Sequence, residues 1–154
     1  MPPYNDLGEW ALYTLKNTAA VTALVYAGAD AIVESGDVSN ADLEAWQAAR
    51  RNAGITNKVL AVFVMDTGES DSRIASCMVF VYDRGASYAN IRATREAVIS
   101  ALVGQPVALP RDAYIVSVDY SARTGHAIDQ DFDLDFERVL FSANVLGREP
   151  DLYA

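Results

Sequence analysis

The side chains best placed to do chemistry are the carboxylates between Asp129 and Glu137, a stretch that reads D-Q-D-F-D-L-D-F-E. Acidic and apolar residues alternate there, and successive residues of a β-strand point to opposite faces. A strand would carry apolar side chains on one face and four carboxylates on the other, those of Asp131, Asp133, Asp135 and Glu137. Such a row could bind a metal ion, transfer protons or form a charged surface.

A calcium-binding loop is suggested by the pattern D-x-D-x-D that starts at Asp129. Loops of this kind place glycine at the sixth position and a bidentate glutamate at the twelfth, where this chain has Leu134 and Leu140. A catalytic carboxylate pair is disfavoured as well, because no partner base or pocket-forming motif accompanies the row. The regular alternation therefore favours an amphipathic strand whose acidic face is solvated.

Other reactive groups are few. His126 is the sole histidine, so a multi-histidine metal site is excluded, and the sole cysteine, Cys77, cannot form an intrachain disulfide. Because Cys77 lies among apolar residues in a predicted strand, it should behave as a small hydrophobe and not as a nucleophile activated by His126. We expect His126 to be solvated in a loop that contains Gly125.

One further stretch could bind an anion. Gly85-Ala86-Ser87 precedes a strong helix and could present backbone amides to it, with Arg84, Arg92 and Arg95 nearby. The chain contains no phosphate-binding loop or other catalytic motif, so a solvated or interface surface explains these arginines better. We predict no catalytic, cofactor-binding or metal-binding residues, and a protein that is not an enzyme.

The charge balance of the chain bears on which partners it can bind. The 154 residues include 21 acidic and 12 basic side chains, for a formal charge of −9. Nucleic-acid affinity comes chiefly from Lys and Arg, so the chain has no general affinity for phosphate backbones. The carboxylates of the row would lie about 7 Å apart, within the Debye length at physiological salt, so an unbroken acidic face suggests a basic partner or a need to repel phosphate.

Periodicity and capping residues predict the elements that hold these groups. Helical spacing and caps predict helices at about residues 6–17, 40–53 and 88–103, and residues 18–27 either continue the first helix or form a second turn. Alternation predicts strands at about 59–65, 73–82, 113–121 and 131–146, with a loop at 123–126. Ala31-Ile32-Val33 is ambiguous and could be a short strand.

This order predicts an α+β two-layer sandwich, in which a mainly antiparallel four-stranded sheet has helices packed on one face. The helix at 40–53 would be a surface insertion between the first helix and the sheet. We expect residues 1–146 to form one domain and residues 147–154 an exposed C-terminal tail. Without a basic signal-peptide region or an apolar run long enough to cross a bilayer, a soluble cytoplasmic product with no membrane contact is expected.

The whole arrangement resembles the tail terminator (tail completion) proteins of long-tailed bacteriophages. The resemblance covers most of residues 6–146 and depends on size, element order and sequence texture. It is carried by the N-terminal helix and by five further segments, at residues 59–64, 76–82, 88–102, 114–118 and 132–136. The helix at 40–53 departs from the minimal pattern of the family.

The resemblance implies a structural virion protein that needs no cofactor. Such proteins form a ring, usually six-fold, that caps the growing tail tube, ends its polymerisation and joins it to the head connector. The implied partners are further copies of the chain, the major tail tube protein and the head-tail connector protein, and assembly would take place in the host cytoplasm. DNA passes through such a ring, so Asp131, Asp133, Asp135 and Glu137 would form an acidic lumen or interface that repels phosphates.

Other classes of function stay open from the sequence. One is another neck or head-completion protein of the same machine. A second is a ferredoxin-like domain that binds a small ligand or dimerises, and a third is an enzyme that uses the carboxylate row and a metal ion.

Overall fold

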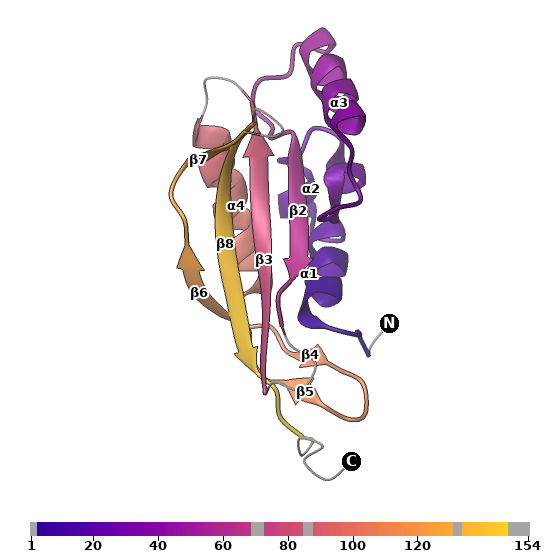
Figure 1. The fold of residues 1–154 in the computed structure, drawn as a ribbon, viewed down its shortest axis with the longest axis vertical. Coiled ribbons are helices and arrows are strands. Elements are labelled where there is room, and N and C mark those ends of the chain that lie inside the picture. Colours follow the sequence, from indigo (N-terminus) through magenta and orange to yellow (C-terminus); the bar gives the residue numbers. More distant parts are fainter. Residues whose placement is uncertain (1–2, 69–72, 85–87, 131–133, 148–154) are drawn as a thin grey trace.

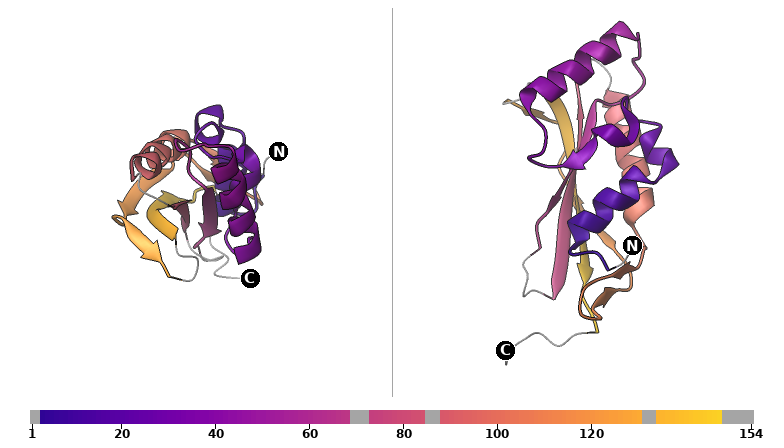
Figure 2. Two further views of the ribbon diagram at one scale, coloured as in Figure 1. Left: turned by 90° about the horizontal axis from the view of Figure 1, so that it is seen from above. Right: turned by 90° about the vertical axis from the view of Figure 1, so that its right-hand side faces the viewer.

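The computed structural model describes residues 3–68, 73–84, 88–130 and 134–147 of the chain. A main sheet and a layer of helices on one of its faces make up the fold (Figures 1 and 2), which confirms the predicted α+β class. The helices are α1 (Leu7–Lys16), α2 (Ala19–Thr22), α3 (Asn40–Asn52) and α4 (Tyr88–Leu102), with a 3-10 turn, η1 (Gly28–Ala31). The main sheet contains β1 (Ile32–Glu34), β2 (Ala61–Asp66), β3 (Ile74–Asp83), β6 (Asp119–Arg123), β7 (Ala127–Asp129) and β8 (Leu134–Asn144).

The main sheet has six strands in the described residues, so the predicted count of four is wrong. Its order is β1-β2-β3-β8-β6, and β7 pairs with β8 on the same side as β6. The predicted antiparallel pairing of β2 with β3 is confirmed, and β8 is antiparallel to β3 as well. The ambiguous Ala31-Ile32-Val33 contributes to β1, which is parallel to β2 because the chain returns through α3 before β2 begins.

The predicted strand at 113–121 is divided in two. Its first part is β5 (Tyr114–Ile115), which forms a separate two-stranded sheet with β4 (Val107–Ala108). The chain then turns toward the end of α4, where Val118 donates a backbone hydrogen bond to Gln105 and accepts one from Gly104. Because Val118 is fully buried there, the strand cannot run straight on, and it resumes as β6.

Local hydrogen bonds explain where two of the helices begin. Asp6 caps α1 by accepting a hydrogen bond from the Glu9 amide at 2.7 Å. Ser39 and Asp42 form a capping box at the start of α3, in which each side chain accepts from the other's backbone amide. The cap expected at Ser87 lies outside the described residues.

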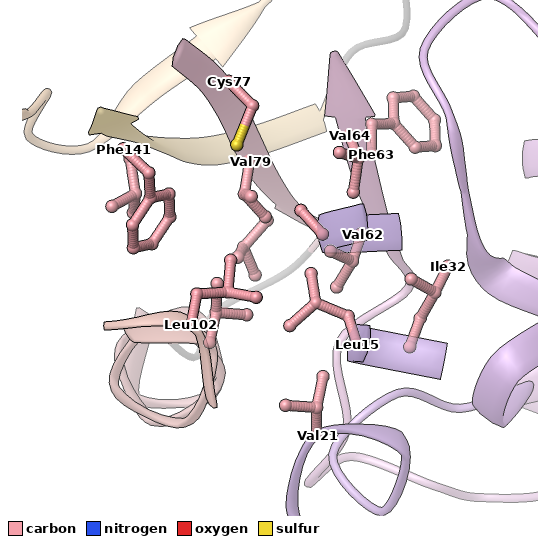
Figure 3. Close-up of a cluster of buried hydrophobic side chains, with 14 of the residues drawn as sticks. Leu15, Val21, Ile32, Val62, Phe63, Val64, Cys77, Val79, Leu102 and Phe141 are labelled. Carbon is pink, nitrogen blue, oxygen red and sulfur yellow. The ribbon is translucent and has the colours of Figure 1, made fainter. Parts of the chain in front are cut away.

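The core lies between the sheet and the helices (Figure 3). Alternate residues of β3 and β8 face α1 and α4, so Val79 and Phe141 are fully buried beside Leu15 and Leu102. At Gly8 the backbone of α1 lies so close to β2 that an added Cβ would come within 2.7 Å of the Asp66 side chain. The Gly8 amide also donates a hydrogen bond to that carboxylate, which fixes the first helix against the sheet.

Helix α3 lies at one end of the molecule, away from α1 and α4 (Figure 2, right). It is an insertion between β1 and β2, and not between the first helix and the sheet as predicted, because β1 already belongs to the sheet. One stripe of α3 is covered: Leu43 and Arg50 are buried, and Trp46 packs against the core. Most of its other residues are exposed, as expected for a surface helix.

Candidate functional site

The acidic row does not form one solvated face over its whole length. Asp131 and Asp133 lie outside the described residues, and the other two members of the row lie on β8. Asp135 is half-buried, whereas Glu137 is completely buried. The prediction of solvation is therefore wrong for Glu137, because this residue belongs to the sheet face that α4 covers.

Glu137 is held by three donors from two other elements. Its Oε2 accepts a hydrogen bond from the Tyr88 hydroxyl at 2.6 Å. Its Oε1 accepts from Arg95 Nη1 at 2.5 Å and from Arg123 Nη1 at 3.2 Å. Tyr88 and Arg95 lie on α4 and Arg123 lies on β6, so one carboxylate fastens a helix and an edge strand to β8. We call Tyr88, Arg95, Arg123 and Glu137 the Glu137 cluster.

The Glu137 cluster keeps its carboxylate ionised. Burial by itself would raise the pKa of Glu137, but the hydrogen bonds from Tyr88 and Arg95 and the charges of Arg95 and Arg123 outweigh it and lower the pKa. The hydrogen bond to Glu137 raises the pKa of the Tyr88 hydroxyl, so that group stays protonated and acts as a donor. Groups held in their ordinary charge states, with their hydrogen bonds satisfied, are typical of a structural network and not of a proton-transfer site.

His126 has a specific partner instead of being only solvated. Its Nε2 lies 2.7 Å from Asp135 Oδ1, and its ring packs edge-on against Tyr88 at a centroid distance of 5.2 Å. The Arg92 guanidinium lies 5.3 Å from the centroid of the same Tyr88 ring. These contacts place the start of α4 beside the loop between β6 and β7.

Cys77 and His126 are not brought together. Cys77 pairs with Phe141 in the middle of β8, whereas His126 contacts Asp135, six residues away along that strand and thus about 20 Å from it. Burial raises the pKa of the Cys77 thiol to about 12, so this thiol is protonated at neutral pH. The interpretation of Cys77 as a small hydrophobe agrees with this environment.

Arg84, Arg92 and Arg95, the arginines near the candidate anion site, make different contacts in the structure. Gly85-Ala86-Ser87 lies outside the described residues. The Arg84 carbonyl accepts a hydrogen bond from Arg50, Arg95 binds Glu137 and Glu96, and Arg92 lies on Tyr88. The side chains of Arg92 and Arg95 therefore contact different groups and do not form one anion site.

A second buried ion pair was missed from the sequence. Arg50, in the last turn of α3, pairs with Asp83 at the end of β3, and both residues are buried. The same guanidinium donates to the carbonyls of Lys58 at 3.0 Å and Arg84 at 3.1 Å. The sequence feature that could have predicted this pair is the position of Arg50 on the same helix face as the buried Leu43 and the partly buried Trp46. A basic residue in the last turn is also explained by the helix dipole, so the feature is not specific to a buried pair.

β3 begins and β8 ends at the end of the molecule opposite α3 (Figure 1), and four exposed apolar residues belong to the chain segments there. Tyr114 and Leu146 form an antiparallel bridge there, and Ile74 pairs with Asn144, two residues before Leu146. The exposed fractions are 56% for Ile74, 46% for Tyr114, 60% for Val116 and 39% for Leu146. We call these four residues the foot patch. An exposed apolar cluster is typical of an interaction surface.

The described part of the chain contains neither a cluster of metal ligands nor a helix that could span a membrane. Within it, no group of three or more histidine, cysteine, aspartate or glutamate side chains is placed to bind a metal ion. None of its helices combines the length and the apolar character needed to cross a membrane.

Comparison with known proteins shows a likeness of fold. No protein-family model matches the chain, and no curated protein matches it at a significant level. Among solved structures, the chain is similar to a chain of a structure described as "Virion of native gene transfer agent (GTA) particle". The sequence identity is 20% and the TM-score is 0.59, and the match covers 92% of this chain and 96% of that chain. The two chains thus share one fold over nearly their full lengths.

Proposed function

We propose that this protein is a structural component of a phage-like virion and acts there as a tail terminator. Copies of it would form a ring that caps the tail tube, ends its polymerisation and joins it to the head connector. The carrying observation is the shared fold with a chain of a gene transfer agent virion, which extends over 92% of this chain. The element order and texture of the sequence support the same assignment through their resemblance to tail terminators.

The surfaces suit a protein that lies between two different partners. The foot patch gives one end of the molecule an apolar surface, while α3 lies at the other end (Figure 1). Residues 17–49, which include all of α3 except its last three residues, contain five acidic side chains and no Lys or Arg; Arg50 and Arg51 follow in the last turn of the helix. A tube and a connector are different proteins, so a protein that joins them needs two chemically different ends. The ionised groups at Glu137 and Arg50 are engaged in structural pairs, which favours assembly over catalysis.

We further propose that Asp131, Asp133 and Asp135 line the lumen of the ring, with the DNA passing through it. A negative wall repels phosphates and prevents the duplex from adhering during passage. Glu137 does not take part in this surface, because Arg95 and Arg123 neutralise it inside the protein. A structure of the ring in which these three carboxylates face outward, or contact a basic neighbour, would refute this assignment.

The function is tested by adding the purified protein to growing tail tubes of the same phage. We expect negative-stain images to show a ring at one tube end, and tube growth to stop there. Tubes that stay uncapped and continue to grow would reject the terminator role, and binding to the head connector alone would indicate another neck protein.

Val116→Asp tests the role of the foot patch in the tube-capping assay. Val116 is 60% exposed, so the substitution should leave folding unchanged while placing a charge in the apolar surface. We expect at least tenfold weaker capping. Tyr13→Asp on α1, which also changes an exposed apolar side chain to aspartate, is the matched control and should cap normally.

A further inference from the structure

The main sheet ends in two edges that differ in chemistry. The strand order places β1 at one edge, and β6 followed by β7 at the other. Within the described residues, β6 and β7 pair only with β8, so their outer sides have no strand neighbour. An open strand edge is a potential surface for another chain.

The edge formed by β6 and β7 carries large apolar side chains and the cationic Arg123. It also carries two acids, the exposed Asp119 on β6 and Asp129 on β7, which accepts a hydrogen bond from the Tyr82 hydroxyl at 3.2 Å. Every residue of β6 is exposed, and Tyr120 and Ile128 are 40% and 61% exposed. The Arg123 side chain is 49% exposed although it contacts Glu137, and Arg92 lies exposed on Tyr88 beside the same edge. We call Tyr120, Arg123, Ile128 and Arg92 the β6–β7 edge.

The opposite edge is acidic. The segment from η1 through β1 to the first turns of α3 contains five carboxylates, all exposed and with no Lys or Arg among them. They belong to Asp30, Glu34, Asp37, Asp42 and Glu44. We call this segment the β1–α3 edge. Two copies meeting through it alone would repel each other.

We infer that the β6–β7 edge of one copy binds the β1–α3 edge of the next copy. The inference rests on the proposed ring, and it specifies the surfaces through which the ring closes. The guanidinium groups of Arg92 and Arg123 then meet carboxylates, whereas a contact between two like edges would bring like charges together. Two different surfaces on opposite edges give a head-to-tail contact, which is the kind that generates rings.

The register of β6 indicates that side chains and not a continuous backbone ladder make this contact. The pairing of β6 with β8 shifts between Tyr120 and Ala122, which marks a bulge at Ser121. Bulges at a sheet edge twist the strand and hinder the addition of a further strand. Exposed Tyr120 and Ile128 are therefore left as the apolar centre of the contact, with the arginines beside them.

Cysteine crosslinking tests which edges meet. Ile128→Cys and Glu34→Cys are made separately and together, and each protein is assembled on tail tubes and treated with a short bismaleimide. Cys77 is buried in every variant and should not react. We expect the doubly substituted chain to give a ladder of covalent oligomers, each single variant to stay monomeric, and a mixture of the two single variants to stop at dimers. Dimers of Ile128→Cys alone would show a contact between like edges and overturn the inference.

A charge variant gives a second measurement. Arg92→Glu should weaken self-association at least tenfold in sedimentation experiments. Lys16→Glu, the same charge change at an exposed position of α1, should leave it unchanged.

The outcomes separate this inference from the proposed function. Capped tubes without the crosslinked ladder would overturn the edge contact and leave the terminator role intact. A ladder without capping would support the edge contact and reject the terminator role. If the doubly substituted chain gives no crosslinked oligomers, either on tail tubes or free in solution at high concentration, the edge contact is overturned.

Discussion

The carboxylate of Glu137 brings a negative charge into the protein interior, and three donors on α4 and β6 make this possible. Removing one partner of a buried charge pair leaves the other charge without compensation, which costs far more than the pair itself contributes. Asp135, two residues earlier, is half-buried and pairs with a His126 side chain that is 46% exposed. The two residues therefore differ in their importance for stability, although both are acids of the same strand.

We expect Glu137→Gln to lower the free energy of unfolding at pH 7 by about 3 kcal/mol, because Arg95 stays buried without its full charge partner. Asp135→Asn, the matched control, should change it by less than about 1 kcal/mol. Urea unfolding followed by circular dichroism measures both values. Equal effects of the two substitutions would contradict the structural role of the Glu137 cluster.

The stability difference between wild type and Glu137→Gln should depend on pH. The pKa of Glu137 is lowered in the folded protein, and its unfolded value is about 4.3. The stabilisation is thus complete above the unfolded pKa and is lost as the pH falls through the lower, folded pKa. The stability difference between wild type and Glu137→Gln should be constant from about pH 5 to pH 7 and should shrink below about pH 4. A difference that widens in acid would show that the pKa shift has the opposite sign.

Cys77 provides a second test at the residue scale. Burial raises the pKa of its thiol to about 12, so almost no thiolate is present at pH 8. We expect the native protein to react with a disulfide reagent at least a hundredfold more slowly than the unfolded protein, in which one thiol should react. Fast reaction of the folded protein would show that β3 opens or that the thiol is accessible.

At the scale of elements, α3 is held to the rest of the fold by the apolar side chains of Leu43 and Trp46 and by one buried ion pair in its last turn. Arg50 joins α3 to β3 through Asp83 and to the following chain through the carbonyl of Lys58. The capping box at Ser39 defines the other end of the helix but lies on the surface. The helix should therefore loosen locally when this buried ion pair is lost.

Arg50→Ala tests this attachment. Asp83 would lose its charge partner, and we expect amide hydrogen exchange to accelerate at least tenfold more in α3 than in β8. Arg51→Ala, an exposed neighbour in the same turn, should change exchange little and stability by less than about 0.5 kcal/mol. Equal acceleration in α3 and β8 would mean that the helix unfolds only with the whole protein.

At the scale of the whole molecule, the sheet depends on contacts between distant parts of the chain. Ile74 pairs with Asn144 and Asp83 pairs with Asp135, so the long β3–β8 ladder closes only after the chain between them has folded back. Loop-closure entropy must be overcome before such a ladder forms, which slows folding.

We therefore expect folding on a time scale of milliseconds to seconds, on the order of that of other proteins rich in distant strand pairs. Stopped-flow fluorescence of a Trp46→Phe variant, in which Trp10 on α1 is the remaining tryptophan and is buried, reports this step. Completion within microseconds would show that local helical contacts, and not the β3–β8 ladder, limit folding.

The sequence by itself determined the features that depend on neighbouring residues. The bounds of α1, α3 and α4 follow from caps and periodicity, since a hydrogen bond such as that from the Glu9 amide to Asp6 spans only three residues. The alternation of β3 likewise predicted a strand in which Cys77 lies among apolar residues, and its thiol is buried.

Only the tertiary structure decided which polar groups are buried and which edges are open. The row from Asp131 to Glu137 has one uniform pattern, yet Glu137 is buried because Arg95 and Tyr88, 42 and 49 residues away, lie opposite it. The parallel pairing of β1 and the division of the predicted strand at 113–121 also depend on distant partners, β2 and the end of α4. A pattern of period two fixes the face of a strand, whereas the partner across that face is supplied by the rest of the fold.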